Sequence, residues 1–99
     1  MIRGTTPTHT FTLPFDGSFV EKAMIIYAQD GKEVFHKNLE SCLLEGNQLS
    51  CTLSQEETFK LADGVSVEIQ LRVLTKGGNA IASYPKVISV WKCLNDEVL

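Results

Sequence analysis

The feature that most constrains the fold is strict two-residue alternation in the segment VSVEIQLRVLT, residues 65–75. Its apolar positions are Val65, Val67, Ile69, Leu71 and Val73, and the residues between them are mostly polar. Successive side chains of a β-strand point to opposite faces, so this segment would present one apolar face and one mostly polar face. On a helix the same apolar residues would spread around the circumference. The segment therefore predicts a half-buried strand.

Several other short segments predict strands in the same way. They are HTFTL (9–13), KEVFHKNL (32–39), LSCTL (49–53), a short segment after Gly77-Gly78 and KVISVWK (86–92). The segment AMIIYAQ (23–29) differs because it is apolar on both faces, as expected of a central strand with both sides covered. Asp30-Gly31 predicts a tight hairpin turn after it, since both residues tolerate positive φ.

One segment predicts a helix. Ser54 and Glu57 have the spacing of a capping box, in which each side chain bonds the backbone amide of the other residue. We expect a short helical turn over residues 55–61 that crosses between two sheets. With about seven to eight strands and turn signals every 8–12 residues, the chain predicts an all-β fold, an antiparallel β-sandwich of immunoglobulin-like type.

Length and composition indicate one domain over residues 1–99 and argue against several functions. The net charge is −3, with 9 Lys and Arg against 12 Asp and Glu. Nucleic-acid binding usually needs a basic face, so we expect no nucleic-acid partner. No apolar run approaches the ~20 residues of a membrane helix, and the start MIRGTTPTHT has no apolar signal-peptide core. We therefore expect no membrane partner and synthesis in the cytoplasm.

The segment CLLEGNQLSC, residues 42–51, places two of the three cysteines around Gly46-Asn47. A two-residue turn there would set Cys42 opposite Cys51, close enough for a disulfide. A reducing cytosol would oppose the disulfide, and a metal site would need further ligands at closer spacing. We favour paired thiols in the core, with the disulfide and the metal site as alternatives.

No pattern of catalytic or cofactor-binding residues stands out. His9 and His36 each share a strand face with apolar residues, so structural roles are expected for both. Glu56 and Glu57 most simply stabilise the N-terminus of the helical turn. We therefore expect no catalytic residue, no metal and no cofactor.

Three stretches carry a resemblance to a known family. MIRGTTPTHTFTLPFD, LSCTLSQEETFKLADGVSVEIQLRVLT and GNAIASYPKVISV resemble short proteins encoded in the tail modules of phages and prophages of Gram-positive bacteria. In organisation they are also similar to the immunoglobulin-like N-terminal domain of phage baseplate upper proteins. The immunoglobulin Cys…Trp…Cys spacing is absent, and Phe59 stands where a tyrosine corner would want a Tyr.

This resemblance implies a small β-sandwich that forms part of a phage tail or baseplate, or helps to assemble it, without being an enzyme. Its partners would be other tail or baseplate proteins, with the chain acting as a homo-oligomer or repeated subunit and ending in the virion tail. Residues 1–7 would form an extended arm that adds to a neighbour's sheet, and 94–99 an apolar tail. The possible partner contacts are Ile2, Arg3, Tyr84, Trp91, Leu94, Val98 and Leu99.

Two further expectations follow from this assignment. Removing residues 1–7 or 94–99 should weaken assembly more than folding. The rival function is a small carbohydrate- or adhesin-type binding module, which would need exposed Tyr27, Tyr84 and Trp91 on one face.

Overall fold

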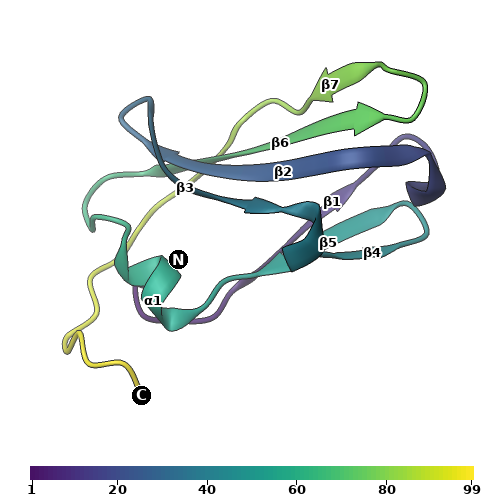
Figure 1. Ribbon diagram of the computed structural model, residues 1–99. Coiled ribbons are helices and arrows are strands. Elements are labelled where there is room, and N and C mark those ends of the chain that lie inside the picture. Colours follow the sequence, from purple (N-terminus) through teal and green to yellow (C-terminus); the bar gives the residue numbers. More distant parts are fainter.

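The computed structural model describes all 99 residues and consists of two antiparallel sheets packed face to face (Figure 1). The smaller sheet has the order β1-β5-β4, and the larger has the order β3-β2-β6-β7, with β8 also paired to β6. The strands are β1 (Thr8–Thr12), β2 (Val20–Gln29), β3 (Lys32–Asn38), β4 (Leu43–Glu45), β5 (Gln48–Thr52), β6 (Val67–Thr75), β7 (Ala80–Ala82) and β8 (Lys86–Ile88). The predicted antiparallel β-sandwich of seven to eight strands is confirmed.

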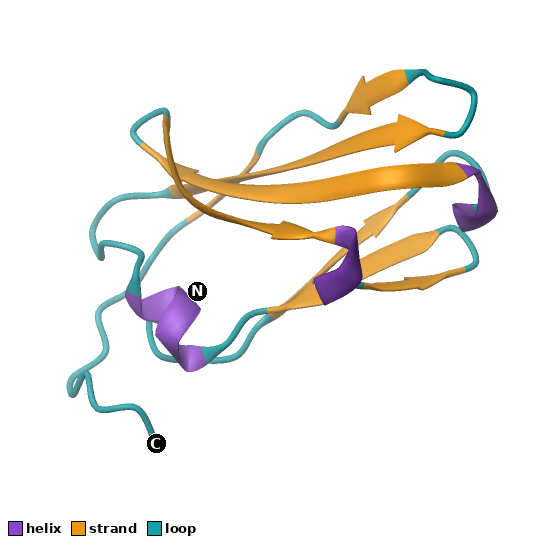
Figure 2. Cartoon of the chain, in the orientation of Figure 1, coloured by secondary structure: helices purple, strands orange, loops and turns teal.

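Three short helical segments lie at the ends of the strands (Figure 2). They are the 3-10 helices η1 (Gly17–Phe19) and η2 (Leu39–Ser41) and the α-helix α1 (Gln55–Phe59). α1 connects β5 of the smaller sheet to β6 of the larger, as predicted, although it ends at Phe59. The capping box is present: the Ser54 hydroxyl accepts from the Glu57 amide at 3.1 Å, and the Glu57 carboxylate accepts from the Ser54 amide at 2.8 Å.

The core lies between the two sheets and follows from the alternation in β2 and β6. Val67, Ile69, Leu71 and Val73 are buried, and the residues between them are half-buried or exposed. β2 pairs with β6 along most of its length and sends Ala23, Ile25, Tyr27 and Gln29 to the same side. Burial of each large apolar side chain contributes about 1.5–3 kcal/mol.

The prediction that β2 is covered on both sides is wrong for the isolated chain. Its second face carries Met24, Ile26 and Ala28, which are only half-buried, and no element packs over them (Figure 1). The apolar residues on that face are consequently part of the protein surface.

The predicted turns form as expected. Asp30 and Gly31 both have positive φ, 52° and 73°, which is the backbone of a type I′ hairpin turn between β2 and β3. Around Gly46-Asn47 the register places Leu44 opposite Leu49 and Leu43 opposite Ser50.

The last predicted strand is shorter than expected, because regular pairing of β8 with β6 stops at Ile88. Beyond it, Trp91 bridges in parallel with Ile2. The Arg3 amide donates to the Trp91 carbonyl at 3.1 Å, and the Trp91 amide donates to the Met1 carbonyl at 2.8 Å. Residues 1–3 therefore pair with residues of their own chain, which corrects the expectation of an arm offered to a neighbour.

Candidate functional site

The cysteines belong to the core. All three are free thiols; Cys51 is buried, and Cys42 is half-buried against the core. Burial raises the pKa of the Cys42 thiol to about 12, and burial also raises the pKa of Cys51. Because the thiolate is the reactive form, both residues are poor nucleophiles near neutral pH. The prediction of core thiols is confirmed, and no group of three His, Cys, Asp or Glu side chains is arranged to hold a metal ion.

His9 is a structural histidine. Its Nδ1 lies 2.8 Å from the Tyr27 hydroxyl, and its ring is tilted against the Tyr27 ring at 5.5 Å between centroids. Burial lowers the pKa of His9. Tyr27 is fully buried and stacks on Phe35 at 4.8 Å, so His9 supplies the hydrogen-bond partner that a buried hydroxyl needs.

The acidic side chain of Glu57 forms part of an internal ion pair. Its Oε2 lies 2.7 Å from Lys37 Nζ, and the two side chains are only 19% and 16% exposed. Burial would raise the pKa of Glu57, but the hydrogen bonds from Lys37 and Ser54 together lower it. The pair connects β3 to α1 and thereby fixes the crossover between the sheets. His36, by contrast, is exposed and bonds Glu33 at 3.0 Å on the same strand.

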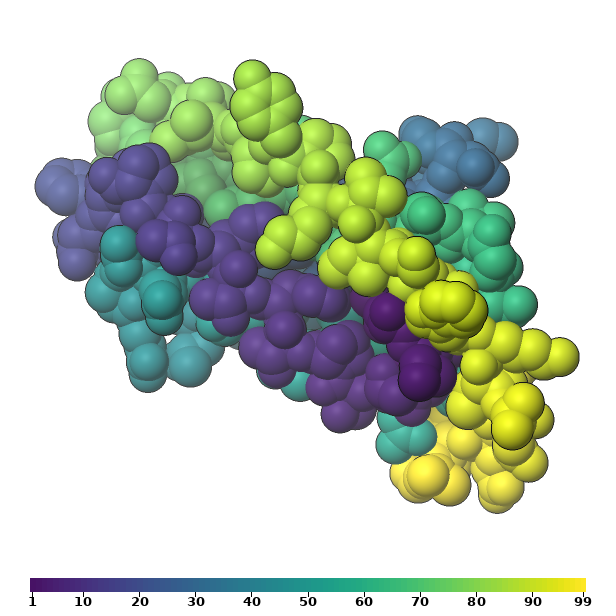
Figure 3. Space-filling view, turned by 180° about the vertical axis from the view of Figure 1, so that it is seen from behind, coloured from purple at the N-terminus to yellow at the C-terminus, as the bar shows by residue number.

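The two chain ends carry five exposed apolar residues, here called the terminal surface: Ile2, Trp91, Leu94, Val98 and Leu99. Their side chains are between 45% and 100% exposed. The strand bridge brings Ile2 and Trp91 together, and the C-terminal segment runs beside the N-terminal residues (Figure 3). Both ends lie near α1 (Figure 1). Gln55 of α1 holds Leu99 through two hydrogen bonds with its backbone, at 2.8 and 3.2 Å.

Arg3 is positioned differently from the prediction, since its guanidinium is largely occupied within the chain. Its side chain is 17% exposed and lies 5.5 Å from the centroid of the Phe59 ring. It donates to the Phe59 carbonyl at 2.9 Å and pairs with Asp96 at 3.4 Å. Arg3 therefore joins the N-terminus to α1 and to the C-terminal segment, and is removed from the set of candidate partner contacts.

Two of the three aromatic residues required by the binding-module alternative are exposed. Tyr84 lies between β7 and β8 and is 97% exposed, and Trp91 is 65% exposed. Tyr27 lies in the core, so the predicted face of three exposed aromatic residues does not form. No hydrogen bond or strand pairing joins Tyr84 to the terminal surface.

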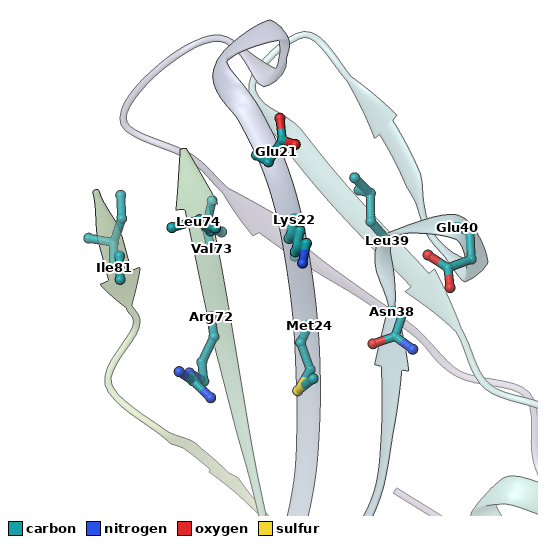
Figure 4. A pocket seen from close by; sticks show the side chains of 12 residues that line it. Glu21, Lys22, Met24, Asn38, Leu39, Glu40, Arg72, Val73, Leu74 and Ile81 are labelled. Atoms are coloured by element: carbon teal, nitrogen blue, oxygen red, sulfur yellow. The ribbon is translucent and has the colours of Figure 1, made fainter. Parts of the chain in front are cut away.

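A second candidate surface lies on the outer face of the larger sheet, which the sequence prediction treated as covered. It contains a shallow groove of about 610 Å³ that crosses β7, β6, β2 and the start of η2 (Figure 4). Met24, Leu39 and Leu74 line its apolar part, and Lys22 and Arg72 stand on the strands beside them. The signal that could have identified this surface is the second apolar set in residues 23–29, Met24, Ile26 and Ala28, because packing of the two sheets covers only one face of that strand.

No helix of the protein is long and apolar enough to cross a bilayer. Comparison with protein-family models, with curated proteins and with solved structures found no match for the chain.

Proposed function

We propose that this protein is a non-enzymatic structural or assembly protein of a phage tail or baseplate that acts through protein–protein contacts. The observation that supports this proposal best is the terminal surface. Five apolar side chains at the two ends of the chain are exposed, and two of them, Ile2 and Trp91, lie on bridged backbone. Exposed apolar patches commonly mark protein interaction sites. The family resemblance of the sequence supplies the phage assignment.

The terminal surface has the composition of an interaction site. Trp91 is a large, rigid anchor of the kind that dominates binding energies at protein interfaces. The strand bridge to Ile2 and the contacts of Gln55 with Leu99 hold both ends of the chain beside α1. A partner could therefore bind apolar side chains whose backbone is already ordered, which lowers the entropic cost of binding.

The proposal is tested by inducing a lysogen that encodes this chain and measuring the proteins of purified particles by mass spectrometry. We expect the chain at a fixed stoichiometry to the other tail proteins, or, if it acts only in assembly, tailless particles when it is deleted. A Trp91→Ser variant should be incorporated less, whereas Thr12→Ser, on the outer face of the smaller sheet, should behave as wild type. Normal infectious particles without the chain would contradict the proposal.

A carbohydrate- or adhesin-type binding module is the second candidate, favoured by the exposure of Tyr84 and Trp91. Aromatic rings of this kind can stack on sugar rings. Glycan-array binding that is lost in Tyr84→Ala and in Trp91→Ala would support this function. Absence of binding to the array, together with incorporation into particles, would exclude it in favour of the structural role.

A further inference from the structure

The two outer faces of the sandwich differ in a way that points to their surroundings. The outer face of the smaller sheet carries hydroxyl groups that bond one another across strands: Thr8 with Thr52 at 2.7 Å, and Thr10 with Ser50 at 3.0 Å. Apart from the exposed Leu43 opposite Ser50, this face is polar and suited to water. The outer face of the larger sheet carries Met24, Ile26 and Ala28 along β2, and Leu74 beside Lys22 at one end. An antiparallel sheet normally alternates apolar and polar residues when one side faces water.

The strand register places the outer side chains of the larger sheet in rows that run across it. Arg72, Met24 and Asn38 form one row, Gln70, Ile26 and His36 form the next, and Glu68 and Ala28 lie in the third, beside Glu33. Lys22 lies beyond the first row, and Asp30 begins the turn beyond the third. Along β2 and β6 the outward residues thus run from Lys22 and Arg72, through an apolar centre, to Glu68 and Asp30, although Glu21 of β2 lies beside Lys22 at the first end.

We propose that this face binds a second copy of the same chain, related by a two-fold axis that lies in the interface, perpendicular to the strands, over Ile26. Such an axis reverses the strand direction and keeps each strand over its own copy. Arg72 of each copy then faces Glu68 of the other, Met24 faces Ala28, and Ile26 faces Ile26. At the ends, Lys22 of each copy approaches Asp30 of the other. The proposal does not depend on the phage assignment.

The charges along β2 and β6 favour a second copy of the chain as the partner and favour the perpendicular two-fold axis. An axis parallel to the strands would place the two Lys22 ends together and the two Glu68 ends together, which electrostatic repulsion opposes. The perpendicular axis instead produces each opposite-charge contact twice, as an isologous interface requires. Glu21 and Glu40 flank the groove at its rim, outside the central rows (Figure 4). The Gln70 amide donates to the Ser83 carbonyl at 2.9 Å, so that donor remains satisfied in the dimer.

The size of the face indicates a weak dimer. Four strands spaced by ~4.8 Å, with about seven residues at ~3.4 Å each, cover roughly 450 Å² in projection. Stable interfaces usually bury about 800 Å² per partner. We therefore expect a dissociation constant of roughly 10 µM to 1 mM, which local concentration in a repeated assembly would favour.

Sedimentation equilibrium over increasing protein concentration tests the proposal directly. The wild type should reversibly form a dimer, and Ile26→Asp should remain monomeric because it places two carboxylates together on the axis. Thr12→Asp, on the outer face of the smaller sheet, is the matched control and should dimerise as the wild type does. Circular dichroism establishes that each variant is folded.

Charge reversal then tests the orientation. Arg72→Glu alone and Glu68→Arg alone should each weaken self-association at least about tenfold, because each variant places like charges together twice. A one-to-one mixture of the two variants should recover dimerisation, since both contacts in the mixed dimer are again between opposite charges. The double variant R72E/E68R should also dimerise by itself.

Three outcomes would overturn the inference. The wild type could remain monomeric up to about 1 mM, which would mean a dissociation constant weaker than the expected range. Ile26→Asp could dimerise as well as Thr12→Asp, which would place the contact elsewhere. The mixture of Arg72→Glu and Glu68→Arg could fail to recover what the single variants lose, which would exclude the antiparallel two-fold arrangement.

Discussion

Nδ1 of His9 lies 2.8 Å from the hydroxyl of Tyr27, which joins β1 of the smaller sheet to β2 of the larger across the core. Tyr27 is fully buried, and burial raises the pKa of its hydroxyl well above the usual value, so the phenol stays neutral. Burial, together with the charges of Lys86 and the N-terminus, lowers the pKa of His9. The folded state therefore favours neutral imidazole at this position.

This relationship predicts a pH dependence of stability. Unfolded His9 takes up a proton near its ordinary pKa of 6.5, whereas folded His9 resists protonation. Stability is therefore complete above pH ~6.5 and decreases as the pH falls below it, by at most about 1.4 kcal/mol per pH unit. Urea unfolding at pH 7.5 and 5.5 should show this loss in the wild type and a smaller one in His9→Gln. An equal loss in both proteins would contradict the assignment to His9.

The ion pair between Lys37 and Glu57 predicts a second effect of defined sign. Because Glu57 has a lowered pKa in the folded protein, its contribution is present at neutral pH and is lost as the pH falls below the ordinary value of 4.5. Glu57→Gln should lower the free energy of unfolding by about 1–3 kcal/mol, since Lys37 is left charged and mostly covered. A double-mutant cycle with Lys37→Met measures the coupling. Coupling near zero would show that the pair contributes little.

The strands were predictable because their signals are local. Alternation in residues 65–75, the Asp30-Gly31 turn and the Ser54–Glu57 box each operate within a few residues, and the structure contains all three. The pairing of Ile2 with Trp91 was not predictable, because it joins segments at opposite ends of the chain and neither carries a distinctive pattern. The contacts of Arg3 were not predictable for the same reason, because Arg3 lies far along the chain from Phe59 and Asp96.

The candidate surfaces were also predictable only in part. The exposed apolar tail was predictable, since Leu94, Val98 and Leu99 follow the last predicted strand and continue no alternating pattern. The face of residues 23–29 that enters the core was not predictable, because both faces of that segment are apolar. Tyr27 turned inward and Ile26 outward as a result of strand register, which depends on pairing with β6.

The structure predicts that position 4, occupied by Gly4, tolerates no side chain. Its φ is 79°, and a Cβ there would collide with the ring of Phe59. Gly4→Ala should lower stability by about 2–4 kcal/mol, through left-handed backbone strain and overpacking. Gly64→Ala is the matched control, because Gly64 has φ 76° with nothing within 4 Å and should lose only about 1–2 kcal/mol. Equal losses in both variants would show that the contact with Phe59 is unimportant.

The burial of the three cysteine thiols predicts the order in which they react with an alkylating reagent. Burial raises the pKa of Cys42 to about 12 and also raises the pKa of Cys51. Cys93 lies in the C-terminal segment outside the core, with its thiol 3.1 Å from the Asn95 carbonyl. In the folded protein at pH 8, iodoacetamide should modify Cys93 first, and the other two only after denaturation. Mass spectrometry of peptides follows each site, and early modification of Cys51 would contradict its burial.

The chain ends predict opposite results from the two truncations. Removing residues 1–7 takes away the pairing with Trp91 and the Pro7 carbonyl that accepts from the Leu53 amide at 2.9 Å. It also removes Gly4 and Thr5, which bond the buried Thr58 hydroxyl at 2.9 Å, and leaves that hydroxyl only the Gln55 carbonyl at 3.2 Å. Unpaired buried polar groups cost about 1–3 kcal/mol each, so this truncation should destabilise the fold by more than about 3 kcal/mol. Assembly would then fail because folding fails.

Removing residues 94–99 should weaken assembly more than it weakens folding. It removes the contact of Arg3 with the exposed Asp96, while Arg3 keeps the Phe59 carbonyl and Asp63, and it removes the bonds of Gln55 with Leu99. Together the lost contacts stabilise the fold by about 1 kcal/mol or less. It also removes Leu94, Val98 and Leu99 from the terminal surface. We therefore expect a small shift of the thermal midpoint, measured by circular dichroism, and reduced incorporation into particles. A large loss of stability with unchanged incorporation would show that the tail serves the fold and that the terminal surface binds no partner.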